Sequence, residues 1–115
     1  MTFQEYFQQV KDRFAGADVS GVASPTRIQI DITGEAAGTF YVEIKDGKLA
    51  VEPYEYHDRD VLLTISDKDF WKIVEKKLDP VVAFTFGKLK AQGDLGKALE
   101  LKKLIQQKIT KEQLT

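Results

Sequence analysis

Cysteine is absent from this chain of 115 residues, and histidine occurs only once, at His57. Without cysteine there can be no disulfide, no thiolate nucleophile and no Cys-ligated zinc site. One histidine leaves a single candidate for a relay with serine or for a His-ligated metal, and no serine lies in a Gly-x-Ser-x-Gly elbow. The sequence therefore predicts a protein that is not an enzyme and that needs no metal or cofactor.

An excess of charge and long apolar runs are also lacking. The 17 Lys and Arg residues nearly cancel the 18 Asp and Glu residues, so the basic excess typical of nucleic-acid binders is missing. No apolar run approaches the ~20 residues of a membrane span. The N-terminus does not resemble a signal peptide, and the C-terminus is not a peroxisomal address. We expect one globular domain over residues 1–115, in the cytoplasm, with no nucleic-acid partner.

The first half of the chain combines one helix with three strands. Thr2 and Glu5 have the spacing of a capping box, and apolar residues follow at helical spacing. From Arg27 onward apolar and polar residues alternate, which predicts half-buried strands. Asp46-Gly47 is a strong hairpin signal, and Pro53 ends the return strand. These strands are expected to form an antiparallel meander with one apolar face.

The second half adds two strands and three helices. Residues 61–65 alternate as a fourth strand and residues 88–92 as a fifth. Ser66 begins a helix with a capping-box pattern, Asp79-Pro80 begins a short second helix, and Asp94 caps the last one. The apolar residues of the last helix cover about 220° of its circumference, which predicts two apolar contacts instead of one stripe. They are Leu95, Ala98, Leu99, Leu101, Leu104, Ile105 and Ile109.

The stretch from Gly87 to Asp94 has glycines and lysines but does not fit a phosphate loop. In a Walker A loop the Gly-Lys pair comes last and a hydroxyl residue follows, whereas here Leu89 follows Lys88 and a strand comes next. Gly93 precedes a helix N-terminus, where anions can bind. The Asp94 carboxylate would repel an anion there, so anion binding is the weaker alternative.

A polar connection between the third and fourth strands carries the single histidine. His57, Asp58 and Asp60 could act in acid-base chemistry or bind a metal. An exposed, solvated loop is the preferred interpretation, because closely spaced ligands on one loop rarely close a site alone. Tyr54 and Tyr56 could stack on bases, but their acidic neighbours favour a role in covering the sheet edge.

Apolar residues in the second half exceed what a small five-stranded domain needs for its core. Phe70, Trp71, Phe84 and Phe86 lie close together in the sequence, beside the wide apolar face of the last helix. Ordinary core is the alternative for any one of them. As a set they favour an apolar binding site.

The run from Asp60 to Leu104 resembles the sterol carrier protein 2 (SCP2) lipid-binding domain. The first half of the chain matches that family by its pattern of helix and meander only. The family's helix usually has glycine before Lys-Leu-Asp/Asn-Pro, where this chain has Lys76. The resemblance rests on Asp60 with Leu63, Ile65-Ser66-Asp67, Asp69-Phe70, Lys77-Leu78-Asp79-Pro80, Ala83-Phe84, Gly87-Lys88-Leu89-Lys90, Gly93-Asp94 and Ala98.

The resemblance implies an α+β fold with a five-stranded, mostly antiparallel sheet. Helices would pack on one face, with a hydrophobic tunnel between sheet and helices that holds a fatty-acyl, sterol-like or isoprenoid chain. The expected ligand is a fatty acid, an acyl-CoA, a sterol or an isoprenoid lipid, carried by a monomer or weak dimer that contacts membranes transiently. The missing peroxisomal tripeptide points to a stand-alone, prokaryotic-type member, for which sterol is the less expected ligand.

Twelve apolar residues are expected to line this site. A lipid pocket should be apolar and of at least ~300 Å³, and an empty cavity of that size would cost roughly 7 kcal/mol. That cost rivals the ~5–15 kcal/mol stability of a typical domain, so we expect a bound ligand or helices partly collapsed onto the sheet. The expected lining is Phe40, Val42, Ile65, Phe70, Ile73, Val74, Leu78, Phe84, Phe86, Leu95, Leu99 and Leu104.

Two other functional classes stay open. The last helix could use its surplus apolar face to bind a protein partner or a second copy of the chain. Alternatively, the domain could be an accessory unit that presents a lipid substrate to an enzyme.

Overall fold

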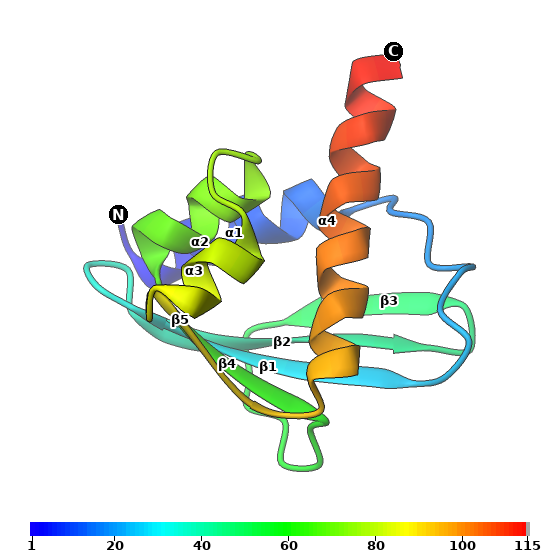
Figure 1. The fold of residues 1–115 in the computed structure, drawn as a ribbon, viewed down its shortest axis with the longest axis horizontal. Coiled ribbons are helices and arrows are strands. Elements are labelled where there is room, and N and C mark those ends of the chain that lie inside the picture. Colours follow the sequence, from blue (N-terminus) through cyan, green and yellow to red (C-terminus); the bar gives the residue numbers. More distant parts are fainter. Residues whose placement is uncertain (115) are drawn as a thin grey trace.

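The computed structural model describes residues 1–114, and the side chains of residues 1–106. Residues 1–114 form one sheet with helices on a single face (Figure 1). Ile109, expected on the apolar face of the last helix, lies outside the described side chains. The elements in chain order are α1 Phe3–Phe14, β1 Thr26–Thr33, β2 Gly38–Lys45, β3 Lys48–Glu52, β4 Val61–Ser66, α2 Asp67–Val74, α3 Pro80–Thr85, β5 Leu89–Gly93 and α4 Leu95–Leu114.

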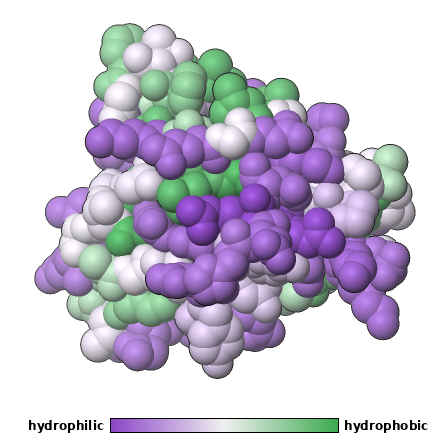
Figure 2. Space-filling view, turned by 90° about the horizontal axis from the view of Figure 1, so that it is seen from below, coloured by the Kyte–Doolittle hydropathy of each residue, from purple (hydrophilic) through white to green (hydrophobic). Residues whose placement is uncertain are grey.

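The sheet has the strand order β3-β2-β1-β4-β5. Strands β1, β2 and β3 form the expected antiparallel meander, and β5 runs antiparallel to β4. Only the β1–β4 pair is parallel among the described residues, so the sheet is mixed but mostly antiparallel, as predicted. It is an open sheet, and its helix-free face is covered mainly by hydrophilic residues (Figure 2).

Asp60 connects two strands and the start of a helix at one end of the sheet. Its carboxylate accepts a hydrogen bond from the Arg27 backbone N–H at 2.8 Å, and its own N–H donates to the Arg27 carbonyl at 2.8 Å. Its carbonyl accepts from the Asp94 N–H at 2.9 Å. Asp60 therefore positions β1, β4 and the start of α4 relative to one another. Its carboxylate, a candidate for acid-base chemistry from the sequence, has a structural role here.

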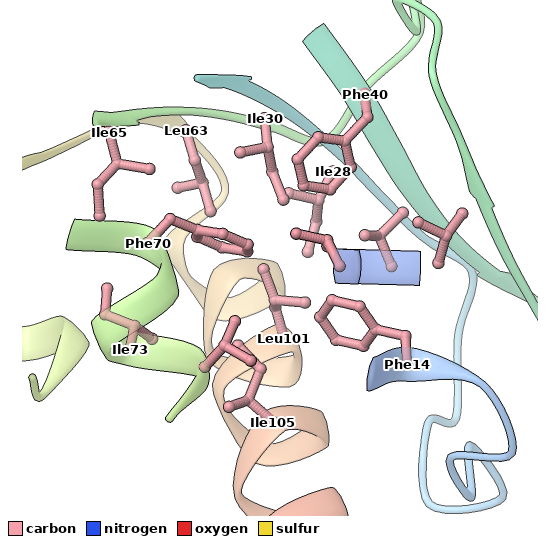
Figure 3. Close-up of a cluster of buried hydrophobic side chains, with 14 of the residues drawn as sticks. Phe14, Ile28, Ile30, Phe40, Leu63, Ile65, Phe70, Ile73, Leu101 and Ile105 are labelled. Carbon is pink, nitrogen blue, oxygen red and sulfur yellow. The ribbon is translucent and has the colours of Figure 1, made fainter. Parts of the chain in front are cut away.

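The hydrophobic core lies between the sheet and the helices α1, α2 and α4 (Figure 3). Phe40 on β2 is its centre, fully buried between Phe7 of α1 and Phe70 of α2, with ring centroids 5.6 and 5.9 Å away. Leu101 and Ile105 of α4 also face this cluster. The apolar faces that the sequence periodicity predicted for α1 and the meander are therefore buried against each other.

A buried carboxylate connects α2 to the rest of the helical layer. Asp67 accepts hydrogen bonds from the Ala36 N–H at 2.9 Å and from the Lys68 N–H at 2.8 Å, and its carbonyl accepts from the Tyr6 hydroxyl at 2.8 Å. Burial, and then the charge of Asp67, raise the pKa of Tyr6 above its usual range. These bonds hold α1, α2 and the β1–β2 turn in one arrangement.

Helix α2 ends at Val74, because the chain turns sharply at Lys76. Lys76 has a φ of 61°, in the left-handed region. The N–H groups of Lys76 and Lys77 donate to the carbonyls of Ile73 and Lys72 at 3.0 and 2.7 Å, which is the Schellman arrangement. Glycine is the usual residue at this position, so a lysine here carries backbone strain.

Replacing Lys76 by glycine is expected to stabilise the fold by about 1 kcal/mol, because glycine adopts the left-handed conformation without a Cβ clash. A urea titration should show a higher midpoint with an unchanged slope. Lys77→Gly is the matched control, since Lys77 has no positive φ, and it should give no gain. A Lys76→Gly variant no more stable than the control would contradict this explanation.

Candidate functional site

An apolar cavity, called the pocket below, lies between α3, β5 and α4, on the same side of the sheet as the core. Its volume is about 260 Å³. Strand β4 and helix α2 contribute residues to its inner wall. Its lining is apolar except for one lysine: Leu63, Phe70, Ile73, Pro80, Val81, Phe84, Leu89, Ala91, Leu95, Ala98, Leu99, Leu101, Lys102 and Ile105.

The apolar pocket has a buried floor and an exposed rim. Its floor includes Phe70 and Leu101, both 3% exposed. Its rim includes Phe84 of α3 and Leu99 of α4, exposed at 46% and 49%. These rim side chains are large, apolar and half exposed. A hydrophobic ligand that enters the pocket would remove their apolar surface from water.

Two helix starts and one glycine shape the rim. Asp79 caps α3 by accepting from the N–H groups of Val81 and Val82 at 2.7 and 3.3 Å, with Pro80 at the first helical position. Gly87 follows α3 with a φ of 78°, which lets the chain turn directly into β5. Asp94 caps α4 in the same way, accepting from the Gly96 N–H at 2.9 Å.

Gly93 is required where β5 passes into α4. Its φ is 116°, and a Cβ at this position would collide with the Asp60 carbonyl oxygen. Only glycine therefore allows β5 to pair with β4 and then release the chain into α4. Gly87 and Gly93 thus lie just after α3 and at the end of β5, two elements that border the pocket.

A second, smaller cavity adjoins the pocket. Its volume is about 110 Å³, and it shares Ile73, Pro80, Lys102 and Ile105 with the pocket. Polar groups contribute to its lining, unlike that of the pocket. Its other lining residues are Lys76, Leu78, Asp79 and Gln106.

The structure brings five of the twelve expected lining residues together in the pocket and leaves seven outside it. Leu78 lines the adjoining cavity, and Phe86 points into solvent with 76% of its surface exposed. The five in the pocket are Phe70, Ile73, Phe84, Leu95 and Leu99. The remaining five, Phe40, Val42, Ile65, Val74 and Leu104, are buried in the core away from the pocket.

The core residues lie outside the pocket because α1 and α2 pack directly on the sheet. Phe7 and Phe70 occupy the space over Phe40 that a wide tunnel would need. The described residues accordingly form a pocket open on one side, with a volume below the ~300 Å³ expected for a lipid pocket. In the part of the chain with described side chains, the tunnel predicted between sheet and helices is not shown.

Nine residues of the pocket were missed by sequence reasoning. Two signals could have found most of them. Leu63 and Ala91 are cross-strand neighbours, so the apolar positions of β5 share the face of those of β4. Leu101 and Ile105 lie four residues apart on one face of α4. The nine are Leu63, Pro80, Val81, Leu89, Ala91, Ala98, Leu101, Lys102 and Ile105.

The other candidate sites from the sequence form no cluster with the pocket. His57 is exposed on the connection between β3 and β4. Tyr56 lies against Tyr41 with ring centroids 5.0 Å apart, and its hydroxyl donates to Glu43 at 2.6 Å, while Tyr54 is 65% exposed. Among the described residues, no group of three His, Asp or Glu side chains could hold a metal ion.

None of the helices in the described part of the chain has both the length and the hydropathy of a transmembrane segment.

Comparison with known proteins identifies the family of this chain and related sequences. The model of the SCP-2 sterol transfer family matches residues 3–106. Hydroxysteroid dehydrogenase-like protein 2 of Mus musculus is 35% identical over 105 residues, covering 90% of this chain but 21% of the mouse protein. The chain thus spans about a fifth of the length of that relative.

Solved structures share the fold. The sterol carrier protein domain 2 of Helicoverpa armigera has a TM-score of 0.60 and 28% identity, covering 91% of this chain and 80% of that one. The palmitated SCP2L2 of Aedes aegypti has a TM-score of 0.62 and 24% identity, covering 91% of this chain and 95% of that one. Both likenesses extend over nearly the whole chain.

Proposed function

Because the chain belongs to the SCP-2 sterol transfer family, we propose that it is a lipid-binding protein that holds one hydrocarbon chain in the apolar pocket. The observation that carries this proposal is the exposure of the rim. Val81, Phe84, Leu95 and Leu99 keep about half of their surface in water around an apolar floor. A hydrocarbon chain laid across that floor would remove this surface from water.

The size of the pocket favours part of a single chain as its occupant. Each buried methylene group contributes ~0.8 kcal/mol, so a segment of six would contribute ~5 kcal/mol before the costs of ordering. A cavity of about 260 Å³ that is open on one side leaves the rest of the lipid outside or in the adjoining cavity. The palmitated Aedes relative supports an acyl chain over a rigid sterol as the ligand of this chain.

The proposed role is binding and transfer without catalysis. The second candidate is a lipid-presenting unit for an enzyme, and the length of the mouse relative favours it, since this chain matches 21% of a protein named as dehydrogenase-like. Both roles require the same pocket. They differ in whether the lipid is released to another protein or held for a catalytic domain.

The test of the proposal is a thermal shift with palmitate, together with native mass spectrometry. A ligand at a hundred times its Kd adds ~2.7 kcal/mol to the stability, which for a domain of this size raises the Tm by roughly 10 °C. Native spectra should show a complex with one palmitate.

Two results would count against lipid binding. The first is an apo mass alone, both as purified and after palmitate addition, together with an unchanged Tm. The second is a dimer in sedimentation experiments that palmitate does not affect, which would instead support an interaction module.

A further inference from the structure

One lysine connects the pocket to the adjoining cavity. Lys102 of α4 is the only charged residue among those lining the pocket, and it also lines the smaller cavity. It is partly buried, and a lysine in such a place can bury its aliphatic stem against apolar surface while its ammonium group stays among polar groups. The polar end of a ligand that extends from the pocket into the smaller cavity would therefore meet Lys102.

The charges around the smaller cavity are predominantly positive. Lys76 and Lys102 line it, together with one carboxylate, that of Asp79. Asp79 already accepts two backbone N–H groups as the cap of α3. The lining thus has two cations and one carboxylate, and that carboxylate already accepts hydrogen bonds from the backbone. The cavity is therefore suited to an additional anion.

Neither lysine side chain has an ion pair with a described residue. The neighbouring lysines are paired: Lys77 lies 3.7 Å from Glu75 and Lys103 lies 3.6 Å from Glu100. The residues three and four positions from Lys102 in α4 are Ala98, Leu99, Ile105 and Gln106, and none of them is acidic. Both lysines that line the smaller cavity are therefore available to an anion.

The backbone at Lys76 adds an independent observation. With a φ of 61° this lysine adopts a conformation that costs about 1 kcal/mol relative to glycine. A strained residue is often retained where its side chain has a task. At this position the side chain lines the same cavity as Lys102.

We propose that Lys102, assisted by Lys76, is the specificity-determining cation of the site and selects lipids with an anionic head group. The inference rests on the proposed function and extends it to the class of ligand. The hydrocarbon chain lies in the apolar pocket and the anionic group lies in the adjoining cavity. Charge-assisted hydrogen bonds from ammonium to carboxylate are stronger than neutral ones, so an acid is held more tightly than an alcohol of the same length.

The experiment compares palmitate with hexadecanol, which has the same number of carbons but no charge. Both are titrated as monomers, without vesicles, at a pH where the carboxyl group of palmitate is ionised. The variants are Lys102→Met, which keeps the stem and removes the charge, and Lys103→Met as the matched control. Lys103 is exposed, lies outside both cavities and is paired with Glu100.

Wild type should prefer palmitate, and Lys102→Met should reduce the ratio of the two affinities about tenfold, the scale of one charge-assisted hydrogen bond. The Lys103→Met control should keep the wild-type ratio. Added salt should weaken palmitate binding by wild type more than by Lys102→Met, because ions screen partly exposed charges.

Two results would overturn the inference in distinguishable ways. If wild type binds both ligands equally, or if Lys102→Met weakens both equally, the head group does not select and only the pocket assignment stands. If wild type binds neither ligand, the proposed function fails together with the inference.

Discussion

Replacing Leu99 by tryptophan is expected to weaken palmitate binding by about a hundredfold, on the estimate of ~0.8 kcal/mol per displaced methylene group. Leu99 stands on the rim of the pocket with 49% of its surface exposed. An indole at this position can turn into the open cavity of about 260 Å³ and fill the space of three or four methylene groups. Their loss amounts to ~3 kcal/mol of binding free energy.

The same change should leave the fold intact, because Leu99 is not part of the close-packed core. The pocket offers room for the larger ring, so the strain that accompanies overpacking of a core is avoided. Circular dichroism and the urea midpoint should therefore stay near the wild-type values, while a fluorescence or calorimetric titration reports the loss of palmitate affinity.

Val82→Trp provides the matched control for added bulk. Val82 lies on α3 with 46% of its surface exposed, but it does not line the pocket. The variant should bind palmitate within about twofold of wild type, because a surface indole displaces nothing from the cavity. Wild-type affinity in Leu99→Trp would show that the hydrocarbon chain lies elsewhere.

Truncating Phe40 to alanine is expected to destabilise the protein by about 3–5 kcal/mol, a large share of the ~5–15 kcal/mol stability of a typical domain. Phe40 is fully buried on β2. Its ring contacts Phe7 and Phe70, with centroid separations of 5.6 and 5.9 Å. Its removal leaves a cavity beneath two helices whose hydrogen bonds, through Asp67, limit their collapse.

Phe86→Ala is the same chemical change at a position that the sequence also assigned to the lining. Phe86 is 76% exposed, so we expect its truncation to change the free energy of unfolding by less than about 0.5 kcal/mol. Urea unfolding of both variants measures the contrast. A cost below about 1 kcal/mol for Phe40→Ala would mean that its surroundings are loose and that ligand space reaches it, contrary to the packed core.

The local elements could be predicted because their signals lie within a few residues. The capping box of Thr2 and Glu5 is present, with the Thr2 N–H donating to the Glu5 carboxylate at 2.9 Å. Asp46 and Gly47 have φ values of 53° and 73°, as the predicted hairpin turn requires. The short helix begins at Asp79-Pro80 as predicted, and Asp94 caps the last helix as predicted.

The sorting of apolar residues into core and pocket could not be predicted, because it depends on what lies opposite each side chain. Phe40 and Phe84 were both predicted from the sequence to line the site. Phe40 is covered by Phe7, which is distant in the chain, whereas Phe84 belongs to a short helix that leaves it 46% exposed. Alternation and helical periodicity state which face is apolar but not how much of that face a neighbouring element covers.

The aromatic residues of the second half of the chain likewise lie in different environments. Phe70 is core and pocket floor, and Phe84 is rim. Trp71 packs against Tyr6 at 6.3 Å with the Arg13 guanidinium 5.7 Å from its ring. The surplus predicted an apolar site, and an apolar cavity is present, but five of the twelve expected residues lie away from it in packed core.

By itself the sequence determined the family, the α+β elements and the absence of cysteine chemistry, since each depends on residue type and short-range spacing. The tertiary structure alone decided that α1 and α2 rest on the sheet and that the cavity opens at α3 and α4. It also placed Lys102, an ordinary charged residue of an amphipathic helix by sequence, between an apolar pocket and a smaller cavity whose lining includes polar groups. Such a position arises only when segments distant along the chain pack together, and no local pattern encodes it.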